Sequence, residues 1–225
     1  MTSSRKDQGK AVGVLVSGGV ESAALLSEAL RRYQRVYPIY VRKGLKWEEA
    51  ELSSLKGLLK AVQTDPLAKL TILDVPVAEI YAHHWSVTQS GTPSFKAPDA
   101  AVYLPGRNLL LLGLGGLFCS LRRVPVLWIG ILKGNPFHDA RTGFVQQMQG
   151  LLAEATGFPL RIAAPFRELT KAQVVRRWPD LPWAKTFSCL NPAGPRHCGR
   201  CQKCAERKTG FQESGIPDPT RYAKS

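Results

Sequence analysis

Ser17-Gly18-Gly19-Val20-Glu21-Ser22 joins an apolar run, Val12 to Val16, to a run with helical spacing, Ala23 to Arg32. Two glycines between a strand and a helix let the backbone approach an anion closely, and the first N–H groups of a helix carry partial positive charge. The stretch therefore predicts a phosphate-binding loop. No lysine directly follows the glycines, so this is not the loop that grips a β,γ-phosphate with a lysine. An ordinary glycine turn is the alternative, and the flanking strand, serine and acid weigh against it.

Length and charge set the broad class. The chain has 225 residues, of which 44% are hydrophobic, so it can fill the core of one large α/β domain with a small appendix. Its formal charge of +14 favours anionic partners such as nucleotides, pyrophosphate or RNA. The basic residues are dispersed along the chain, so the cationic surface of a soluble enzyme fits equally well.

The sequence predicts no membrane segment. The first ten residues are polar and lack the apolar core of a signal peptide. Leu109 to Leu121 is the longest apolar run, but it contains three glycines and is too short to span a bilayer, so it predicts a buried helix. We expect a cytoplasmic protein.

Four of the five cysteines are clustered near the C-terminus, at Cys189, Cys198, Cys201 and Cys204. Four thiolates at these short spacings suit a tetrahedral Zn²⁺ site with Zn–S distances of about 2.3 Å. Such a closed site is structural and fastens a segment that is too short to build its own core. An iron–sulfur cluster is the remaining alternative, whereas disulfides are disfavoured by the missing secretory signal. Cys119 is expected in the core.

Short β-branched or apolar runs alternate with runs of helical spacing. The expected strands are Val12–Ser17, Val36–Val41, Leu70–Val75 and Val126–Ile131, and the expected helices are Ser22–Arg32, Trp47–Val62, Asn108–Leu121 and Arg141–Thr156. This alternation predicts an α/β protein with a doubly wound, mostly parallel sheet. Ligands bind such sheets at the carboxyl ends of the strands, where residues 17–22, 42–46 and 132–139 would emerge. Residues 78–99 are expected to form a long loop or lid.

The glycine loop resembles the Ser-Gly-Gly-x-Asp-Ser loop of the ATP pyrophosphatases, also called PP-loop enzymes, whose fold is that of the adenine nucleotide alpha-hydrolases. In order along the chain, further motifs resemble the 7-cyano-7-deazaguanine (preQ0) synthase family. They are Pro105-Gly106-Arg107-Asn108, Ile129-Gly130, Phe137-His138-Asp139-Ala140-Arg141, Pro165 with Lys171, Ser188-Cys189, Cys198-Gly199-x-Cys201-x-x-Cys204-x-x-Arg207 and Asp218-Pro219-Thr220-Arg221-Tyr222.

This resemblance implies an ATP-dependent carbon–nitrogen ligase that works in two stages. The carboxylate of 7-carboxy-7-deazaguanine attacks the α-phosphate of ATP to form an acyl-adenylate, and ammonia displaces AMP to give an amide. A second adenylation of the amide oxygen and a dehydration then give the nitrile. The protein must hold the departing pyrophosphate and orient the attacking group.

The resemblance also assigns residues and cofactors. It implies ATP, Mg²⁺ and Zn²⁺ as cofactors, with the zinc held by the four clustered cysteines. The catalytic cations are expected to be Lys171 and Arg107. The expected ATP-binding residues are Val16, Ser17, Gly18, Gly19, Glu21 and Ser22, and the expected substrate-binding residues are Asn108, Asp139 and Arg141. An ordinary ion pair is the alternative role for Arg107 and Asp139.

Three departures from the family pattern concern the substrate. Glu21 replaces the usual Asp, His138 replaces a Pro, and Arg42-Lys43-Gly44-Leu45-Lys46-Trp47 replaces Asp-Tyr-Gly-Gln-x-His. The last change removes an amide and an imidazole and adds cationic and apolar groups. A divergent ligase that adenylates another carboxylate or a protein terminus is therefore an alternative, as is a zinc-containing RNA-binding or RNA-modifying protein.

We expect three parts of the chain: a flexible N-terminus over residues 1–10, a PP-loop ATP-binding domain over residues 11–180, and a zinc-binding segment over residues 181–225 packed on it. The expected partners are ATP, ammonia and a small acid. A macromolecular carrier, a protein substrate and a homodimer are left open.

Overall fold

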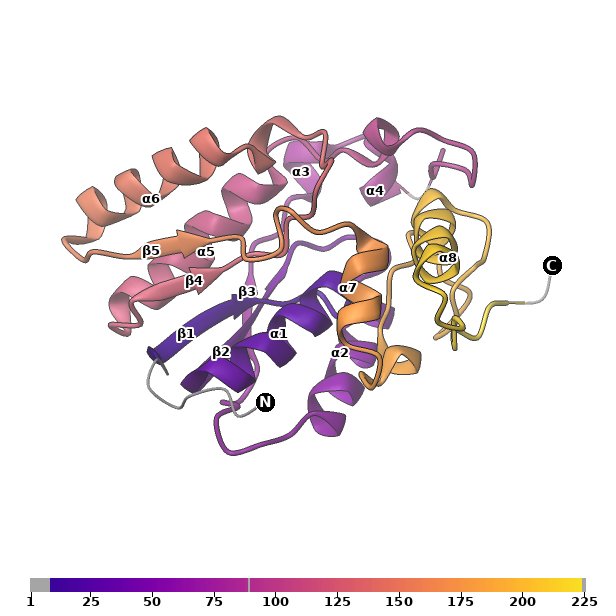
Figure 1. Cartoon of the computed structure of the whole chain (residues 1–225). Helices are drawn as coiled ribbons and strands as arrows, with labels where there is room; N and C mark the ends of the chain where they lie inside the picture. Colours follow the sequence, from indigo (N-terminus) through magenta and orange to yellow (C-terminus); the bar gives the residue numbers. More distant parts are fainter. Residues whose placement is uncertain (1–8, 89, 224–225) are drawn as a thin grey trace.

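Five parallel strands form one sheet in the spatial order β3-β2-β1-β4-β5 (Figure 1). The computed structural model describes residues 9–88 and 90–223. The strands are β1 (Gly9–Leu15), β2 (Tyr33–Arg42), β3 (Thr71–Asp74), β4 (Val126–Trp128) and β5 (Arg161–Ala163).

Helices cover both faces of the sheet (Figure 1). Helices α1 (Val20–Arg32), α2 (Glu48–Ala61) and α7 (Lys171–Arg177) lie on one side, and α5 (Arg107–Leu121) and α6 (Thr142–Thr156) lie on the other. Helix α8 (Gln202–Ser214) lies beyond one end of the sheet, and the two short helices α3 (Ala78–Tyr81) and α4 (Trp85–Thr88) lie near it. The described residues also include 3-10 turns at Asp99–Val102, His138–Ala140 and Trp183–Lys185.

The alternation of side chains along β1 explains this layering. Val12, Val14 and Val16 pack into the core under α1, α2 and α7, whereas Leu15 packs into a second core under α5 and α6. A strand buried on both faces has no polar side, which is why its sequence is continuously apolar. The predicted doubly wound, parallel α/β fold is confirmed.

The four predicted strands and four predicted helices are all present, with differences at their ends. Strand β5 and helices α7 and α8 were not predicted. Residues 78–99 are not one continuous loop, since they include α3 and α4. The predicted buried helix is α5, but only one of its faces is buried: Leu121 is 76% exposed. Of the predicted flexible N-terminus, residues 1–8 lie outside the described residues.

The strand order reverses between β1 and β4, and the phosphate loop follows β1 at this point. Successive connections run from β1 to β2 and β3 on one side and to β4 and β5 on the other. A Cβ on Gly130, which follows β4, would lie 3.5 Å from Glu21 Cβ, so the two connections meet here. Such a switch point is where doubly wound sheets bind ligands. Within the described ranges, no helix is both long and apolar enough to cross a membrane.

Close contact between β1 and α5 gives a first prediction. A Cβ on Gly13 would lie 2.4 Å from Cys119 Sγ, whereas Gly57 in α2 has nothing within 4 Å of the corresponding position. We expect Gly13→Ala to lower the free energy of unfolding by about 1–3 kcal/mol through overpacking. Gly57→Ala should instead raise it by about 0.4–1 kcal/mol.

Denaturant unfolding of both variants measures this difference. In the Gly13→Ala/Cys119→Ala double variant, the part of the destabilisation that comes from the clash between positions 13 and 119 should largely disappear, because the sulfur is gone. An unaltered penalty in the double variant would show that the contact is not its cause.

Candidate active site

The phosphate loop is held in shape by its own serines. Gly18 has a φ of +77°, a conformation that favours glycine. The amide of Ser17 donates to Ser22 Oγ at 3.2 Å, and the Ser22 hydroxyl donates to the Gly19 carbonyl at 3.2 Å. Gly19 is the N-cap of α1 and no side chain caps the helix. The first N–H groups of α1 are therefore available to an anion, as predicted.

A cavity of about 330 Å³ opens beside this loop. Its walls come from the loop, the carboxyl ends of β1, β2 and β4, the start of α5, and the cysteine segment. Of the predicted ATP-binding residues, Val16, Ser17, Gly19, Glu21 and Ser22 line it. Gly18 lies behind the wall, where its Cβ position is 3.3 Å from Leu55 Cβ in α2.

Lys171 is the central cation of the cavity. Its Nζ lies 2.5 Å from Glu21 Oε1 and 2.7 Å from Glu206 Oε1, and Lys203 Nζ lies 2.5 Å from the other oxygen of Glu206. Burial alone lowers the pKa of Lys171, but the two carboxylates outweigh it and raise the pKa above its ordinary value. Burial raises the pKa of Glu206, but Lys171 and Lys203 outweigh it and lower that pKa to about 2.

Two of the three predicted substrate residues, Asn108 and Asp139, line the cavity, and the third, Arg141, does not. Asp139 is buried, and both of its carboxylate oxygens accept hydrogen bonds from Asn108. The backbone N–H of Asn108 donates to Oδ2 at 2.8 Å, and its side-chain Nδ2 donates to Oδ1 at 3.2 Å. Asp139 thus fixes the start of α5, from which the exposed Arg107 reaches the cavity. Arg141 is exposed before α6 and is not part of the cavity wall within the described residues. Its role in substrate binding stays a prediction.

The unusual Arg42–Trp47 segment forms one wall and is built around Glu48. This carboxylate accepts hydrogen bonds of 2.7–3.0 Å from the backbone N–H groups of Lys43, Gly44 and Leu45. It also lies 3.2 Å from Lys43 Nζ. Burial lowers the pKa of Lys43, although Glu48 opposes this effect. The segment is therefore ordered by an internal carboxylate, and Lys43, Leu45 and Trp47 line the cavity.

Trp47 is both a core residue and part of the cavity wall. It is only 8% exposed and belongs to the core that surrounds the cysteines, yet it also lines the cavity. Its ring stacks on Trp85 of α4, with centroids 5.6 Å apart. Tyr103 and Phe137 form a second stacked pair in the cavity wall, with centroids 5.0 Å apart.

Several wall residues were not predicted from the sequence. Ser188 Oγ is buried without a hydrogen-bond partner among the described residues. Other wall residues outside the predicted site set carry charged or phenolic groups, among them Tyr40, Lys43, Glu51, Lys203 and Glu206. Lys203 and Glu206 follow Cys201 closely, so the cysteine spacing was the signal that could have located them.

The four clustered cysteines converge. All four sulfur atoms lie within 4.8 Å of one another, and the Cys201–Cys204 and Cys189–Cys201 separations are 3.5 and 3.9 Å. A tetrahedral zinc with bonds of about 2.3 Å requires sulfurs roughly 3.8 Å apart. Backbone N–H groups also point at these sulfurs, as in the 3.2 Å contact from Cys198 to Cys189. The donor set therefore fits a tetrahedral, thiolate-bound metal.

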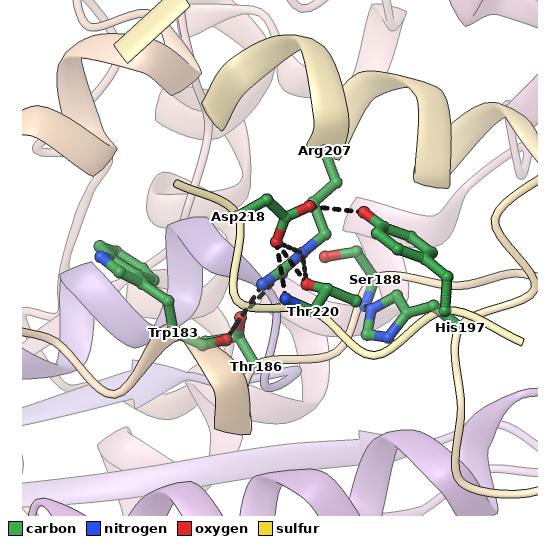
Figure 2. Close-up of polar contacts among 8 residues, drawn as sticks. Trp183, Thr186, Ser188, His197, Arg207, Asp218 and Thr220 are labelled. Carbon is green, nitrogen blue, oxygen red and sulfur yellow. Dashed lines mark hydrogen bonds and ion pairs between the residues drawn. The ribbon is translucent and has the colours of Figure 1, made fainter. Parts of the chain in front are cut away.

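A buried arginine ties the C-terminal tail to this segment (Figure 2). Arg207 has 0% exposure and donates to Thr220 Oγ1 at 2.6 Å, to Thr186 Oγ1 at 2.7 Å and to the Trp183 carbonyl at 3.0 Å. Its Nε also lies 3.4 Å from Asp218 Oδ1. The same guanidinium therefore joins α8, the segment before the cysteines and the tail.

The cysteine segment also contacts residues 78–99. The backbone N–H of Gln202 donates to the Pro93 carbonyl at 3.0 Å, and the side-chain Nε2 of Gln202 donates to Asp99 Oδ1 at 2.5 Å. A β-bridge joins Ser94 to Cys201. The segment that was predicted as a long loop or lid is thus anchored on the cysteine segment.

The parallel sheet and the phosphate loop at its switch point define an α/β nucleotide-binding protein of the PP-loop class. The fold of a solved 4-thiouridine synthetase–RNA complex with bound ATP is similar, with a TM-score of 0.50 and 12% identity over 92% of this chain and 51% of that chain. The family described as queuosine biosynthesis protein QueC matches residues 10–215. The chain belongs to this family, which confirms the family predicted from the motifs and makes the chain a ligase-type enzyme.

Curated relatives match nearly the whole chain. A 7-cyano-7-deazaguanine synthase of Anaeromyxobacter dehalogenans is 30% identical over 94% of this chain and 95% of its own length. The protein of the same description from Xanthomonas euvesicatoria pv. vesicatoria is 32% identical over 93% of this chain and 96% of its own length.

The Arg207 contacts give a second prediction. We expect Arg207→Leu to lower the free energy of unfolding by about 3–5 kcal/mol, because a buried, hydrogen-bonded ion pair is broken. The control is Arg221→Leu, an exposed position in the same tail that should change the value by less than about 0.5 kcal/mol. Thermal or denaturant unfolding provides the measurement, and equal effects of the two substitutions would refute the buried contact network.

Proposed function

We propose that the chain converts 7-carboxy-7-deazaguanine and ammonia to 7-cyano-7-deazaguanine, with cleavage of ATP to AMP and pyrophosphate. The observation that carries the proposal is the phosphate loop, which has no lysine of its own and opens into a cavity beside Lys171. Such a site holds a pyrophosphate by backbone N–H groups and a separate cation. Family membership and the descriptions of the relatives support the substrate.

The chemistry needs activation of a poor acyl donor. A carboxylate oxygen of the acid attacks the α-phosphorus, pyrophosphate leaves, and ammonia then displaces AMP to form the amide. The amide oxygen is adenylated in turn, and loss of AMP with a proton from nitrogen gives the nitrile. In this scheme the Ser17–Ser22 loop holds the departing pyrophosphate, and Lys171 and Arg107 stabilise the charge that develops on the phosphates.

Mg²⁺ would neutralise phosphate charge, and the residues present fit it. Mg²⁺ takes one or two carboxylates together with phosphate oxygens. Glu21 and Glu206 are the carboxylates on either side of Lys171 at the loop. Their side chains would hold the ion when ATP binds.

A specific observation favours a second candidate function, a ligase that adenylates another carboxylate or a protein terminus. The wall built by Lys43, Leu45 and Trp47 is largely apolar, because the Lys43 ammonium is paired with Glu48. An apolar wall discriminates between ligands less strongly than buried polar groups do. A macromolecular carrier, a homodimer and a cytoplasmic location stay predictions.

Product analysis tests the function directly. We expect protein incubated with 7-carboxy-7-deazaguanine, ammonium and ATP to yield the nitrile, AMP and pyrophosphate by mass spectrometry and chromatography. Ser17→Ala should reduce ATP use, because the hydroxyl that accepts from Gly19 N at 3.3 Å is lost. ADP and phosphate as stoichiometric products would overturn the proposal, and conversion of other acids only would favour the second candidate.

We also propose that the metal of the four cysteines is zinc, with a structural role. Elemental analysis should find one zinc per chain, and Cys201→Ser should release it and lower the unfolding temperature. Cys119→Ser is the control, since Cys119 is packed against Gly13 in the core and away from the cluster. Absorption and iron analysis distinguish zinc from an iron–sulfur cluster, and a metal-free, fully stable protein would contradict the proposal.

A further inference from the structure

Glu51 in α2 is one of five carboxylates that line the cavity. It lines the same wall as Tyr40 of β2, and Tyr40 donates its hydroxyl to Glu51 Oε2 at 2.8 Å. No lysine or arginine lies within ion-pair distance of Glu51 among the described residues. Oε1 receives no hydrogen bond from that part of the chain. Glu51 thus has one hydrogen bond and no ion pair from these residues, although it lies beside the glycine loop.

Its position is next to the loop. The Cβ position of Gly18 is 3.5 Å from the Glu51 carbonyl oxygen and 3.3 Å from Leu55 Cβ, one turn further along α2. The first turns of α2 thus run directly behind the loop. A carboxylate on this helix that faces the cavity lies close to the place where the loop would hold the phosphates.

The charged and titratable groups around Glu51 come from three elements. Tyr40 belongs to β2, Lys43 follows β2, Glu48 is on α2 itself and Arg107 is on α5. Burial and Glu48 raise the pKa of Glu51, while Lys43, Tyr40 and Arg107 oppose them, and the result is a pKa of about 7. A carboxylate in this range can both accept and release a proton at neutral pH.

We propose that Glu51 is the proton acceptor for the nitrogen nucleophile, a role that rests on the proposed function. Ammonium, the main form of ammonia at neutral pH, transfers one proton to Oε1 of Glu51. The freed electron pair forms a bond to the acyl carbon of the adenylate. The bond between that carbon and the AMP oxygen breaks, and AMP leaves with its electron pair. The new C–N unit loses a second proton to solvent, so an amide, AMP and two protons are formed from acyl-adenylate and ammonium.

The test separates adenylation from nitrogen transfer. Acid-dependent exchange of labelled pyrophosphate into ATP reports adenylation, and amide plus nitrile formation reports nitrogen transfer. In Glu51→Gln we expect product formation at pH 7 to fall about 100-fold or more, the usual contribution of a general base. The loss should be confined to the steps after adenylation. Glu49→Gln is the matched control, because Glu49 is on the same helix with a side chain that is 78% exposed.

The pH profile provides the second readout. At saturating total ammonium, wild-type product formation should rise with pH to a plateau above a midpoint near 7. The Glu51→Gln rate should instead keep rising as free ammonia increases. Tyr40→Phe removes a hydrogen bond that lowers the pKa of Glu51, so its midpoint should shift to higher pH. This variant keeps the carboxylate and tests the idea even if Glu51→Gln does not fold.

The outcomes are distinct. Loss of pyrophosphate exchange in Glu51→Gln would assign Glu51 to ATP binding and overturn the proposal. Wild-type product formation by Glu51→Gln at pH 7, or an unshifted midpoint in Tyr40→Phe, would overturn it as well. Absence of acid-dependent exchange in the wild type would instead contradict the proposed function itself.

Discussion

The hydrogen bond from the Phe187 amide to the Gly18 carbonyl, at 2.8 Å, joins the two halves of the active site. Gly18 belongs to the phosphate loop, and Phe187 begins the segment that carries the cysteines. Through this bond Ser188 becomes part of the cavity wall, and α8 brings Lys203 and Glu206 to Lys171. The cavity is therefore incomplete without the C-terminal segment.

This dependence gives a physical reason for the four converging cysteines and the buried arginine. The segment after α7 is short, and large apolar side chains such as Trp183 and Phe211 are buried in the core of the main domain instead of forming a core of their own. An isolated short segment cannot offset its conformational entropy. Four converging sulfurs and the Arg207 hydrogen bonds supply the missing constraint, and Arg207 in turn holds Asp218 and Thr220 of the tail. The cysteine segment thus shapes the wall of the cavity beside the glycine loop, and Cys189 itself belongs to that wall.

The sequence predicted those features whose signals are local. The apolar run before the loop, the glycine pair and the helical spacing after it lie within 21 consecutive residues, 12–32, and β1 and α1 were found there. Strand β5 has a single β-branched residue, Ile162, and lacks the longer apolar run that marks the equally short β4. Helix α8 is mostly polar, because Cys204 and Arg207 are buried in place of an apolar stripe. In α5, Leu112 is buried and Leu121 is exposed because only one face of the helix packs against α6 and the sheet. The run of leucines in the sequence does not indicate which face this is.

The sequence predicted which residue types the site contains, but not which ion pairs and hydrogen bonds its carboxylates form. Five carboxylates line the cavity, and four of them have specific partners or solvent. Glu21 and Glu206 share one lysine, Asp139 accepts two hydrogen bonds from an asparagine, and Asp99 is exposed and bonded to a glutamine amide. Asp139 thus fixes the start of α5, and its predicted role in substrate binding stays a prediction. Among the described residues, Glu51 is the carboxylate whose side chain has only a tyrosine hydroxyl as partner. One of its oxygens is therefore available, and burial gives the carboxylate the proton affinity that chemistry on an amine requires.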